Sequence, residues 1–224
     1  MKKLFKNEDL FLQALTHRSW VNENIGIRGT NERLEFLGDA VLEFVVSKEL
    51  YNLFPNEEEG YLTALRANLV NTKNLSEVAK RLEIGKEIFL SKGEEDGGGR
   101  ENASLLADSV EAIIGALFID QGLESAEKFI EENILIDALE KSKSPLKDPK
   151  SLLQENIQAK KLPAPRYTVI SEDGPDHKKD FTIEVAINGR PVAIGTGKSK
   201  SEAEQNAATK ALLTYCGIDL DTLK

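Results

Sequence analysis

The hydrophobic pattern changes once along this 224-residue chain, near residue 148, and the change limits the architectures that the chain can adopt. In residues 1–147, apolar side chains recur every three or four positions, which is typical of amphipathic helices. In residues 148–224, shorter runs alternate between apolar and polar side chains, which predicts strands with a helix on either side. We therefore expect an all-α domain followed by a small α+β domain, and the length suits two domains.

The first part contains five helical stretches that are separated by helix-breaking residues. They cover Leu10–Leu15, Leu34–Phe54, Leu62–Leu82, Leu105–Ile119 and Ala126–Leu139. Pro55, Gly85 and Gly122 stand where three of these helices are expected to stop. Residues 92–101 are rich in glycine and charge, so they are expected to form a mobile loop.

The second part has the element order α-β-β-β-α. The expected elements are a helix over Lys150–Gln158, strands over Arg166–Ser171, Phe181–Ile187 and Pro191–Gly195, and a helix over Ser201–Tyr215. Asn188-Gly189 predicts a two-residue hairpin turn between the last two strands. We assign residues 1–143 to the first domain, 144–148 to a proline-containing linker and 149–218 to the second domain.

Composition narrows the class of protein. Hydrophobic residues make up 40% of the chain and charged residues 30%, which suits a soluble globular protein. The longest apolar run, Ala112–Ile119, is too short to cross a bilayer core of roughly 30 Å. The early charged residues do not resemble a secretory signal. One cysteine and two histidines exclude a disulfide framework and a cysteine zinc site. We expect a cytoplasmic protein without a membrane partner.

Charge is distributed unevenly between the two parts. The net charge is −9, and residues 1–147 hold 18 basic and 27 acidic side chains. Residues 148–224 hold 11 of each, so the whole acidic excess lies in the helical part. Such an excess either keeps a surface soluble or holds cations, and the positions of the acids must decide.

Two apolar helices carry regularly spaced carboxylates. Glu32, Glu35 and Asp39 follow the spacing i, i+3, i+7, so they share one face of the first helix. Asp108 and Glu111 are spaced i, i+3 in a second helix that is otherwise nearly free of charge. Charges in such surroundings cost free energy unless they are paired or bound to a metal.

Two interpretations of these carboxylates compete. A single helical acid is usually solvated or part of a salt bridge. However, Leu105–Ile119 offers no basic side chain, and Arg33 can pair with only one acid. Convergence of both helices on divalent cations explains the pattern better. Oxygen ligands without histidine or cysteine favour magnesium or manganese, and such sites suit phosphate chemistry.

Three segments resemble a known family. NERLEFLGDAVLEF, residues 31–44, resembles the signature of the bacterial ribonuclease III family, and LLADSVEAIIGALFID, residues 105–120, resembles its second acidic motif. LTHRS, residues 15–19, is similar to the early helix of that family. The resemblance covers nearly the whole chain and implies metal-dependent endonucleolytic cleavage of double-stranded RNA.

The resemblance also implies roles for individual residues. The matched metal ligands are Glu35, Asp39, Asp108 and Glu111, of which Asp39 and Glu111 are also assigned as catalytic. Glu32 and Glu59 match accessory acids that assist at the cleavage site or across a dimer. Phe36 matches an aromatic residue that inserts into a pocket of the partner subunit of a homodimer. The expected cofactor is Mg²⁺, for which Mn²⁺ can substitute.

The second domain resembles a double-stranded RNA-binding domain. The matched RNA-binding residues are Ser151, Gln154, Glu155, His177, Lys198 and Lys200. Lysines and backbone amides at a helix N-terminus form a phosphate site, and duplex RNA is recognised by shape with few base contacts. Without this context, Lys198 and Lys200 would be interpreted as ordinary surface lysines.

Three residues fall outside the matched pattern. Ser201 stands where the family usually has a second lysine or arginine. Glu43 lies on the same helix face as the carboxylates, and we expect a solvated residue there rather than an additional charge at the site. His17 is expected to be a structural histidine in a packed helix.

Two functions follow from these expectations. The first is a metal-dependent ribonuclease that leaves 5′-phosphate and 3′-hydroxyl ends with a short 3′ overhang. It would process structured precursors such as ribosomal RNA and some messenger RNAs. The second is a non-catalytic RNA-binding protein that uses a degenerate nuclease fold as a dimerisation scaffold. All four matched carboxylates are present, which favours the enzyme.

Overall fold

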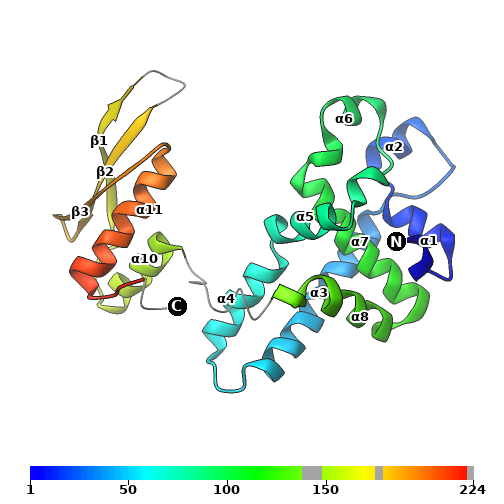
Figure 1. Ribbon diagram of the computed structural model, residues 1–224, viewed down its shortest axis with the longest axis horizontal. Coiled ribbons are helices and arrows are strands. Elements are labelled where there is room, and N and C mark those ends of the chain that lie inside the picture. The colour runs from blue at the N-terminus through cyan, green and yellow to red at the C-terminus, as the bar shows by residue number, and fades with distance from the viewer. Residues whose placement is uncertain (138–147, 175–178, 221–224) are drawn as a thin grey trace. The chain divides into compact units, whose positions relative to one another are not determined.

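The computed structural model describes residues 1–137, 148–174 and 179–220, and the chain divides into two compact units, Met1–Lys141 and Ser142–Lys224 (Figure 1). The linker expected at residues 144–148 lies outside the described residues, except for Asp148. The side chain of Asp148 caps the first helix of the second unit by accepting a hydrogen bond from the Ser151 amide.

The first unit is helical throughout its described part. Its α-helices are α1 Glu8–Ala14, α2 Arg18–Glu23, α3 Glu32–Leu53, α4 Glu59–Val70, α5 Thr72–Arg81, α6 Lys92–Asp96, α7 Ala103–Gln121 and α8 Leu123–Asn133. Four short 3₁₀ helices accompany them at Lys2–Leu4, Ile84–Lys86, Gly99–Glu101 and Leu135–Asp137.

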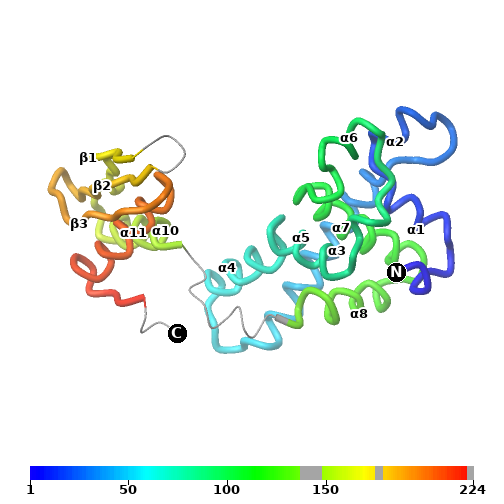
Figure 2. Tube along the Cα trace, turned by 45° about the horizontal axis from the view of Figure 1, so that its top comes forward, coloured from blue at the N-terminus to red at the C-terminus, as the bar shows by residue number. Residues whose placement is uncertain are grey.

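Helices α3 and α7 form the centre of this unit. They share the most extensive helix–helix contact, and Figures 1 and 2 show them side by side. The core of this unit buries Val45 and Val46 of α3 and Ile113 and Ile114 of α7. Helix α4 packs on α3, and α1, α5 and α8 pack on α7. The expected all-α class is therefore confirmed for the first unit.

Three local expectations for the first unit were wrong. The helix expected over Ala126–Leu139 ends at Asn133, and a 3₁₀ turn follows at Leu135–Asp137. The apolar stretch Leu62–Leu82 is not one helix, because Asn71 is extended and its side chain caps α5 through the Asn74 amide at 2.9 Å. Residues 92–101 are not an irregular loop, because they form α6 and a 3₁₀ turn. The Arg100 guanidinium fastens this segment by donating to backbone carbonyls that include Gly85 and Ile88, at 2.9 and 3.1 Å.

The second unit has the expected α-β-β-β-α order. Its elements are α10 Pro149–Ala159, β1 Arg166–Asp173, β2 Asp180–Ile187, β3 Arg190–Gly197 and α11 Lys200–Ala211, followed by a π-helical turn at Leu212–Cys216. The three strands form an antiparallel sheet in the order β1-β2-β3. Asn188 and Gly189 have φ angles of 50° and 75°, so the hairpin turn needs the left-handed backbone that this pair tolerates.

The core of the second unit lies between the sheet and its two helices. Leu153 and Ile157 of α10 meet Val185 and Ile187 of β2. Helix α11 contributes small residues to this core, namely Ala207, Ala208 and Ala211. The described part of the chain contains no helix that is long and apolar enough to cross a membrane.

Candidate functional site

The beginning of α3 is fixed by backbone hydrogen bonds from distant segments. Asn31, which precedes α3, donates its amide to the Thr16 carbonyl at 2.9 Å. The neighbouring residues Leu15 and His17 bond to the Phe89 backbone at 2.9 and 3.1 Å. These contacts hold the first turn of α3, with Glu32 and Glu35, next to the start of α2.

Two glycines let α3 and α7 cross with their backbones in contact. A Cβ atom on Gly38 would collide with the Glu111 carbonyl oxygen, and one on Gly115 would collide with the Leu34 carbonyl oxygen. Because Gly38 lies between Glu35 and Asp39, this close crossing brings the carboxylates of both helices into one place.

Three of the four predicted metal ligands converge. Glu35, Asp108 and Glu111 can each present a carboxylate oxygen within 4.8 Å of the other two. All three side chains are partly buried. Asp39 is exposed and is not a member of this close group among the described residues. Its charge nevertheless raises the pKa of both Glu35 and Glu111, so it borders the group.

Burial raises the pKa values of the three converging acids, and repulsion by neighbouring carboxylates adds to the rise for Glu35 and Glu111. Burial is the main cause for Glu111, followed by the charges of Asp39 and Asp108, and its pKa rises to about 8. Burial also raises the pKa of Glu35 and that of Asp108. The described residues therefore concentrate more negative charge than they neutralise, which is the electrostatic setting of a cation site.

The two predicted accessory acids lie in different places. Glu32 borders the carboxylate group: its charge raises the pKa of Glu35, and it accepts a hydrogen bond from Thr30 at 3.1 Å. Glu59 begins α4, which follows the far end of α3. A 22-residue helix is about 33 Å long, so the Glu59 of the same chain is remote from Glu35. A role for Glu59 at the cleavage site remains a prediction.

Glu43 is not the solvated residue that we expected. Its carboxylate lies 2.8 Å from the Arg66 guanidinium of α4, and its side chain is 38% exposed. Arg66 also donates to the Ser47 hydroxyl at 2.8 Å. The charge of Glu43 contributes to the raised pKa of Glu111, so Glu43 borders the site. The Glu43–Arg66 pair could not be predicted from helical spacing, because Arg66 belongs to another helix.

His17 also differs from the expectation, because it caps a helix instead of lying within one. Its Nδ1 atom accepts from the Ser19 amide at the start of α2. Burial raises the pKa of Asp108, and an electrostatic interaction with His17 partly opposes this rise, so the ring lies near the carboxylate group. The resemblance of the LTHRS segment to the early helix of the family gives no spacing signal that links His17 to α7.

Phe36 lies on the outside of the first unit. Its side chain is 80% exposed on α3, although it is flanked by buried Leu34 and by Gly38. An exposed aromatic ring at this position is compatible with a contact to a second chain.

In the second unit, three predicted RNA-binding residues share one face of α10. Ser151, Gln154 and Glu155 are exposed, whereas Leu153 and Ile157 on the opposite face are buried. The Ser151 hydroxyl donates to the Asp148 carboxylate at 2.6 Å. His177, the remaining residue predicted to reach a second minor groove, lies outside the described residues.

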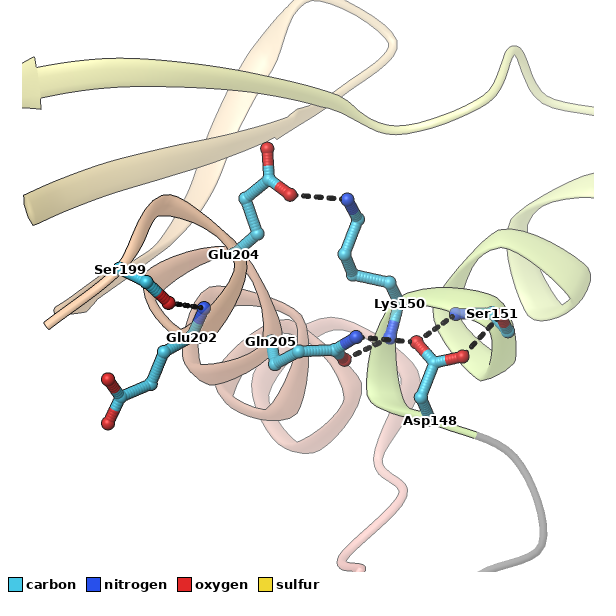
Figure 3. Close-up of polar contacts among 7 residues, drawn as sticks. All are labelled: Asp148, Lys150, Ser151, Ser199, Glu202, Glu204 and Gln205. Carbon is cyan, nitrogen blue, oxygen red and sulfur yellow. Dashed lines mark hydrogen bonds and ion pairs between the residues drawn. The ribbon is translucent and has the colours of Figure 1, made fainter. Parts of the chain in front are cut away.

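Hydrogen bonds join the start of α10 to Gln205 in the second turn of α11 (Figure 3). Gln205 of α11 donates to the Asp148 carboxylate at 2.8 Å and accepts from the Lys150 amide at 3.1 Å. Beside this junction, a pocket of about 260 Å³ is lined in part by Ser151 and Gln154. The junction therefore fixes the predicted RNA-binding face of α10 relative to α11.

The two predicted phosphate-binding lysines flank the start of α11. Lys198 follows β3, and Lys200 is the first residue of α11. Ser199 caps the helix by accepting from the Glu202 amide at 3.1 Å, as Figure 3 shows. Both lysine side chains are exposed, and each already forms an ion pair, with Asp180 and Glu172 respectively.

Comparison with known proteins identifies both units. Residues 7–138 match the family described as Ribonuclease-III-like, and residues 149–215 match the Double-stranded RNA binding motif. Ribonuclease 3 of Geobacillus kaustophilus is 46% identical over 216 residues, covering 96% of this chain and 88% of that protein. Ribonuclease 3 of Streptomyces coelicolor is 48% identical over 205 residues, covering 90% and 73%.

Solved structures support the same assignment for the first unit. The nuclease domain of ribonuclease III from Campylobacter jejuni is 41% identical, with a TM-score of 0.54, covering 60% of this chain and 90% of that one. Another structure of that domain, 43% identical with the same TM-score of 0.54, is described as flexible in a region involved in dimer formation. It covers 60% of this chain and 96% of that one. The chain belongs to the ribonuclease III family of endoribonucleases.

Proposed function

We propose that this protein is a metal-dependent endoribonuclease that hydrolyses double-stranded RNA and leaves 5′-phosphate and 3′-hydroxyl ends. The observation that carries the proposal is the convergence of Glu35, Asp108 and Glu111 within 4.8 Å, from two helices, in a chain with a double-stranded RNA binding motif. A degenerate, non-catalytic scaffold would have no need to keep three mutually repelling acids partly buried.

The donor set fits a hard divalent cation. Glu35, Asp108 and Glu111 offer only carboxylate oxygens, which suit Mg²⁺ and Mn²⁺ better than softer metals. Asp39, which is exposed and borders these three carboxylates, completes the proposed set of ligands. A bound cation neutralises charge on the phosphate and lowers the pKa of water. The raised pKa of Glu111 means that this side chain must lose a proton before it can act as a charged ligand.

The second unit supplies the attraction for the RNA substrate. The first unit repels RNA phosphates because of its acidic excess, so a separate binding surface has to supply the attraction. We assign contacts in one minor groove to Ser151, Gln154 and Glu155, and contacts with phosphates to Lys198 and Lys200. His177 would reach the next minor groove.

Cleavage of both strands requires two sites. We propose a homodimer in which Phe36 of each chain inserts into the partner, with Glu32 and Glu59 as accessory acids. Two sites related by a twofold axis would cut the two strands with a short 3′ overhang. We expect the enzyme to act in the cytoplasm on structured precursors of ribosomal RNA and of some messenger RNAs.

The test is a single substitution with a matched control. Glu111→Gln keeps the size of the side chain but removes the charge of a ligand, so cleavage of duplex RNA should fall by several orders of magnitude. Glu77→Gln on the exposed face of α5 makes the same chemical change away from the site and should cleave as the unsubstituted protein does. Binding of duplex RNA with Ca²⁺ in place of Mg²⁺ should stay unchanged in both variants. Near-normal cleavage by Glu111→Gln would rule out Glu111 as a ligand.

A further inference from the structure

Carboxylates gather at the end of the sheet that faces the start of α11. Glu172 and Asp173 end β1, and Asp180 begins β2. The Lys198 ammonium lies 2.7 Å from Asp180 Oδ1, and the Lys200 ammonium lies 2.8 Å from Glu172 Oε1. Both cations that we assign to RNA phosphates are therefore already paired with carboxylates of the same domain.

The strand register places like charges opposite each other, which favours the binding of cations by these carboxylates. Asp173 and Asp180 are directly opposite each other in the β1–β2 pairing. Like charges in such a cross-strand pair repel, so the Lys198 ammonium stabilises this end of the sheet. The neighbouring cross-strand pair is Glu172 and Phe181, and Lys200 contacts both, with its ammonium 5.5 Å from the centroid of the Phe181 ring.

These two ion pairs are exposed, unlike the pair that Lys150 of α10 forms with Glu204 of α11. The side chains are 67% and 57% exposed for Lys198 and Asp180, and 57% and 35% for Lys200 and Glu172. Lys150 is more enclosed: it pairs with Glu204, as Figure 3 shows, and its ammonium lies 4.8 Å from the centroid of the Tyr167 ring. The Lys198 and Lys200 pairs are therefore free to exchange with an external anion, whereas the Lys150 pair belongs to the junction of the two helices.

We propose that Asp180 and Glu172 set the affinity of this domain for duplex RNA by competing with its phosphates for Lys198 and Lys200. The proposal rests on the assignment of these lysines to phosphate contacts under the proposed function. A phosphate that binds either lysine must displace the carboxylate that is already paired with it. It also leaves the displaced carboxylate close to the RNA polyanion, where the two repel each other.

This competition affects the salt dependence as well as the affinity. A phosphate contact normally weakens with salt because it releases counterions from the RNA. Here salt also screens the exposed pairs that the RNA must displace. The two effects oppose each other, so the slope of log affinity against log salt is shallower than two free lysines would give.

The experiment uses the full chain with a chelator, so that a fixed RNA duplex stays intact, and measures filter binding at several salt concentrations. Asp180→Asn and Glu172→Gln should each strengthen binding roughly two- to fivefold at low salt, as expected for exposed ion pairs. Each should also steepen the salt slope. Thermal unfolding of each variant checks that the domain remains folded.

Glu184→Gln is the matched control. It removes one negative charge from the middle strand of the same sheet, and Glu184 forms no ion pair with any residue that the structure describes. If Asp180→Asn and Glu172→Gln bind no better than Glu184→Gln, the competition is overturned and only net charge matters.

Lysine variants separate failure of this inference from failure of the proposed function. Lys198→Gln and Lys200→Gln should weaken binding, and in the Lys198→Gln background Asp180→Asn should gain no more than the Glu184→Gln control. If the lysine variants bind RNA normally, these lysines do not contact RNA. The phosphate contacts assigned to them under the proposed function would then be wrong. If the lysine variants bind RNA more weakly but Asp180→Asn and Glu172→Gln bind no better than the Glu184→Gln control, the competition is overturned and the proposed function stands.

Discussion

Glu111 has the most perturbed ionisation among the carboxylates of the site. It projects from a helix whose other faces are buried, and burial together with Asp39 and Asp108 raises its pKa from 4.5 to about 8. Between pH 4.5 and about 8, Glu111 of the folded, metal-free protein holds a proton that Glu111 of the unfolded chain has already released. The contribution of Glu111 to the free energy of unfolding is therefore fully present below pH 4.5 and is lost as pH rises towards about 8.

This linkage predicts opposite effects of pH on metal-free stability and on metal affinity. The Tm of the chelated protein should fall between about pH 5 and pH 8, and Glu111→Gln should remove much of that fall. The affinity for Mn²⁺ should rise over the same range, by up to about tenfold per pH unit, because one bound proton has to leave. Thermal melts and calorimetric titration measure the two quantities.

The exposed Glu77→Gln variant serves as the control and should follow the unsubstituted protein at each pH. A Tm profile that is the same in Glu111→Gln and in the unsubstituted protein would show that Glu111 is not the group that titrates.

At the scale of elements, the site depends on how closely α3 approaches α7. Gly115→Ala would place a Cβ against the Leu34 carbonyl and force the two helices apart. We expect the free energy of unfolding to fall by about 1–3 kcal/mol, as for other overpacked positions. Because displacement of about 1 Å can slow catalysis about a hundredfold, cleavage should fall by a comparable factor. Urea denaturation and cleavage rates check both effects.

Gly60→Ala in α4 is the control for this substitution, since a Cβ at Gly60 meets nothing within 4 Å. It should leave cleavage unchanged and stabilise the helix by up to about 1 kcal/mol. If Gly115→Ala behaved in the same way, the close crossing would not be needed to hold the carboxylates together.

The start of α11 offers a second test at this scale. Ser201 is exposed in the first turn of α11, and the family resemblance implies a cation at this position that faces RNA phosphates. Ser201→Lys should add about one phosphate contact and steepen the salt slope by roughly one unit or less. The gain should not depend on RNA sequence, because phosphate contacts position the duplex without specifying it.

Filter binding at several salt concentrations measures this slope. Thr214→Lys adds the same charge in the π-helical turn beyond the far end of α11, and it should change the slope less. Equal slopes for the two variants would mean that Ser201 does not face the phosphates.

At the scale of the whole molecule, the two units divide the work between chemistry and binding. The fragment of residues 1–143 contains all the predicted metal ligands and its own core, so it should remain dimeric and cleave weakly at low salt. Sedimentation should report twice the monomer mass. A monomeric fragment would place the dimer contacts elsewhere in the chain.

Phe36→Asp in the same fragment should break the dimer, because it would put a charge into an apolar pocket of the partner. The substitution should not unfold the chain, since Phe36 is 80% exposed within one protomer. The sedimentation coefficient should fall to that of a folded monomer, with an unchanged helical circular dichroism signal. A dimer that survived would exclude Phe36 from the interface.

Local pattern was sufficient for most of the elements. Periodicity located α3 and α7 because each helix buries one continuous apolar face, and Asn188-Gly189 located the β2–β3 hairpin because few other residue pairs accept its φ angles. Periodicity failed at Asn71 and over residues 92–101. In both places side-chain hydrogen bonds decide the backbone path: Asn71 Oδ1 accepts from the Asn74 amide, and the Arg100 guanidinium donates to the Gly85 carbonyl.

The sequence alone determined which carboxylates share a helix face, since the spacing of Glu32, Glu35 and Asp39 depends only on the helical repeat. It could not determine distances between helices. The approach of Asp108 and Glu111 to Glu35, the pairing of Glu43 with Arg66, and the neutralisation of Lys198 by Asp180 each join segments distant in sequence. Only the packing of α7 and α4 on α3 and the register of the sheet create these contacts, because an interaction between distant segments exists only once the chain between them has folded.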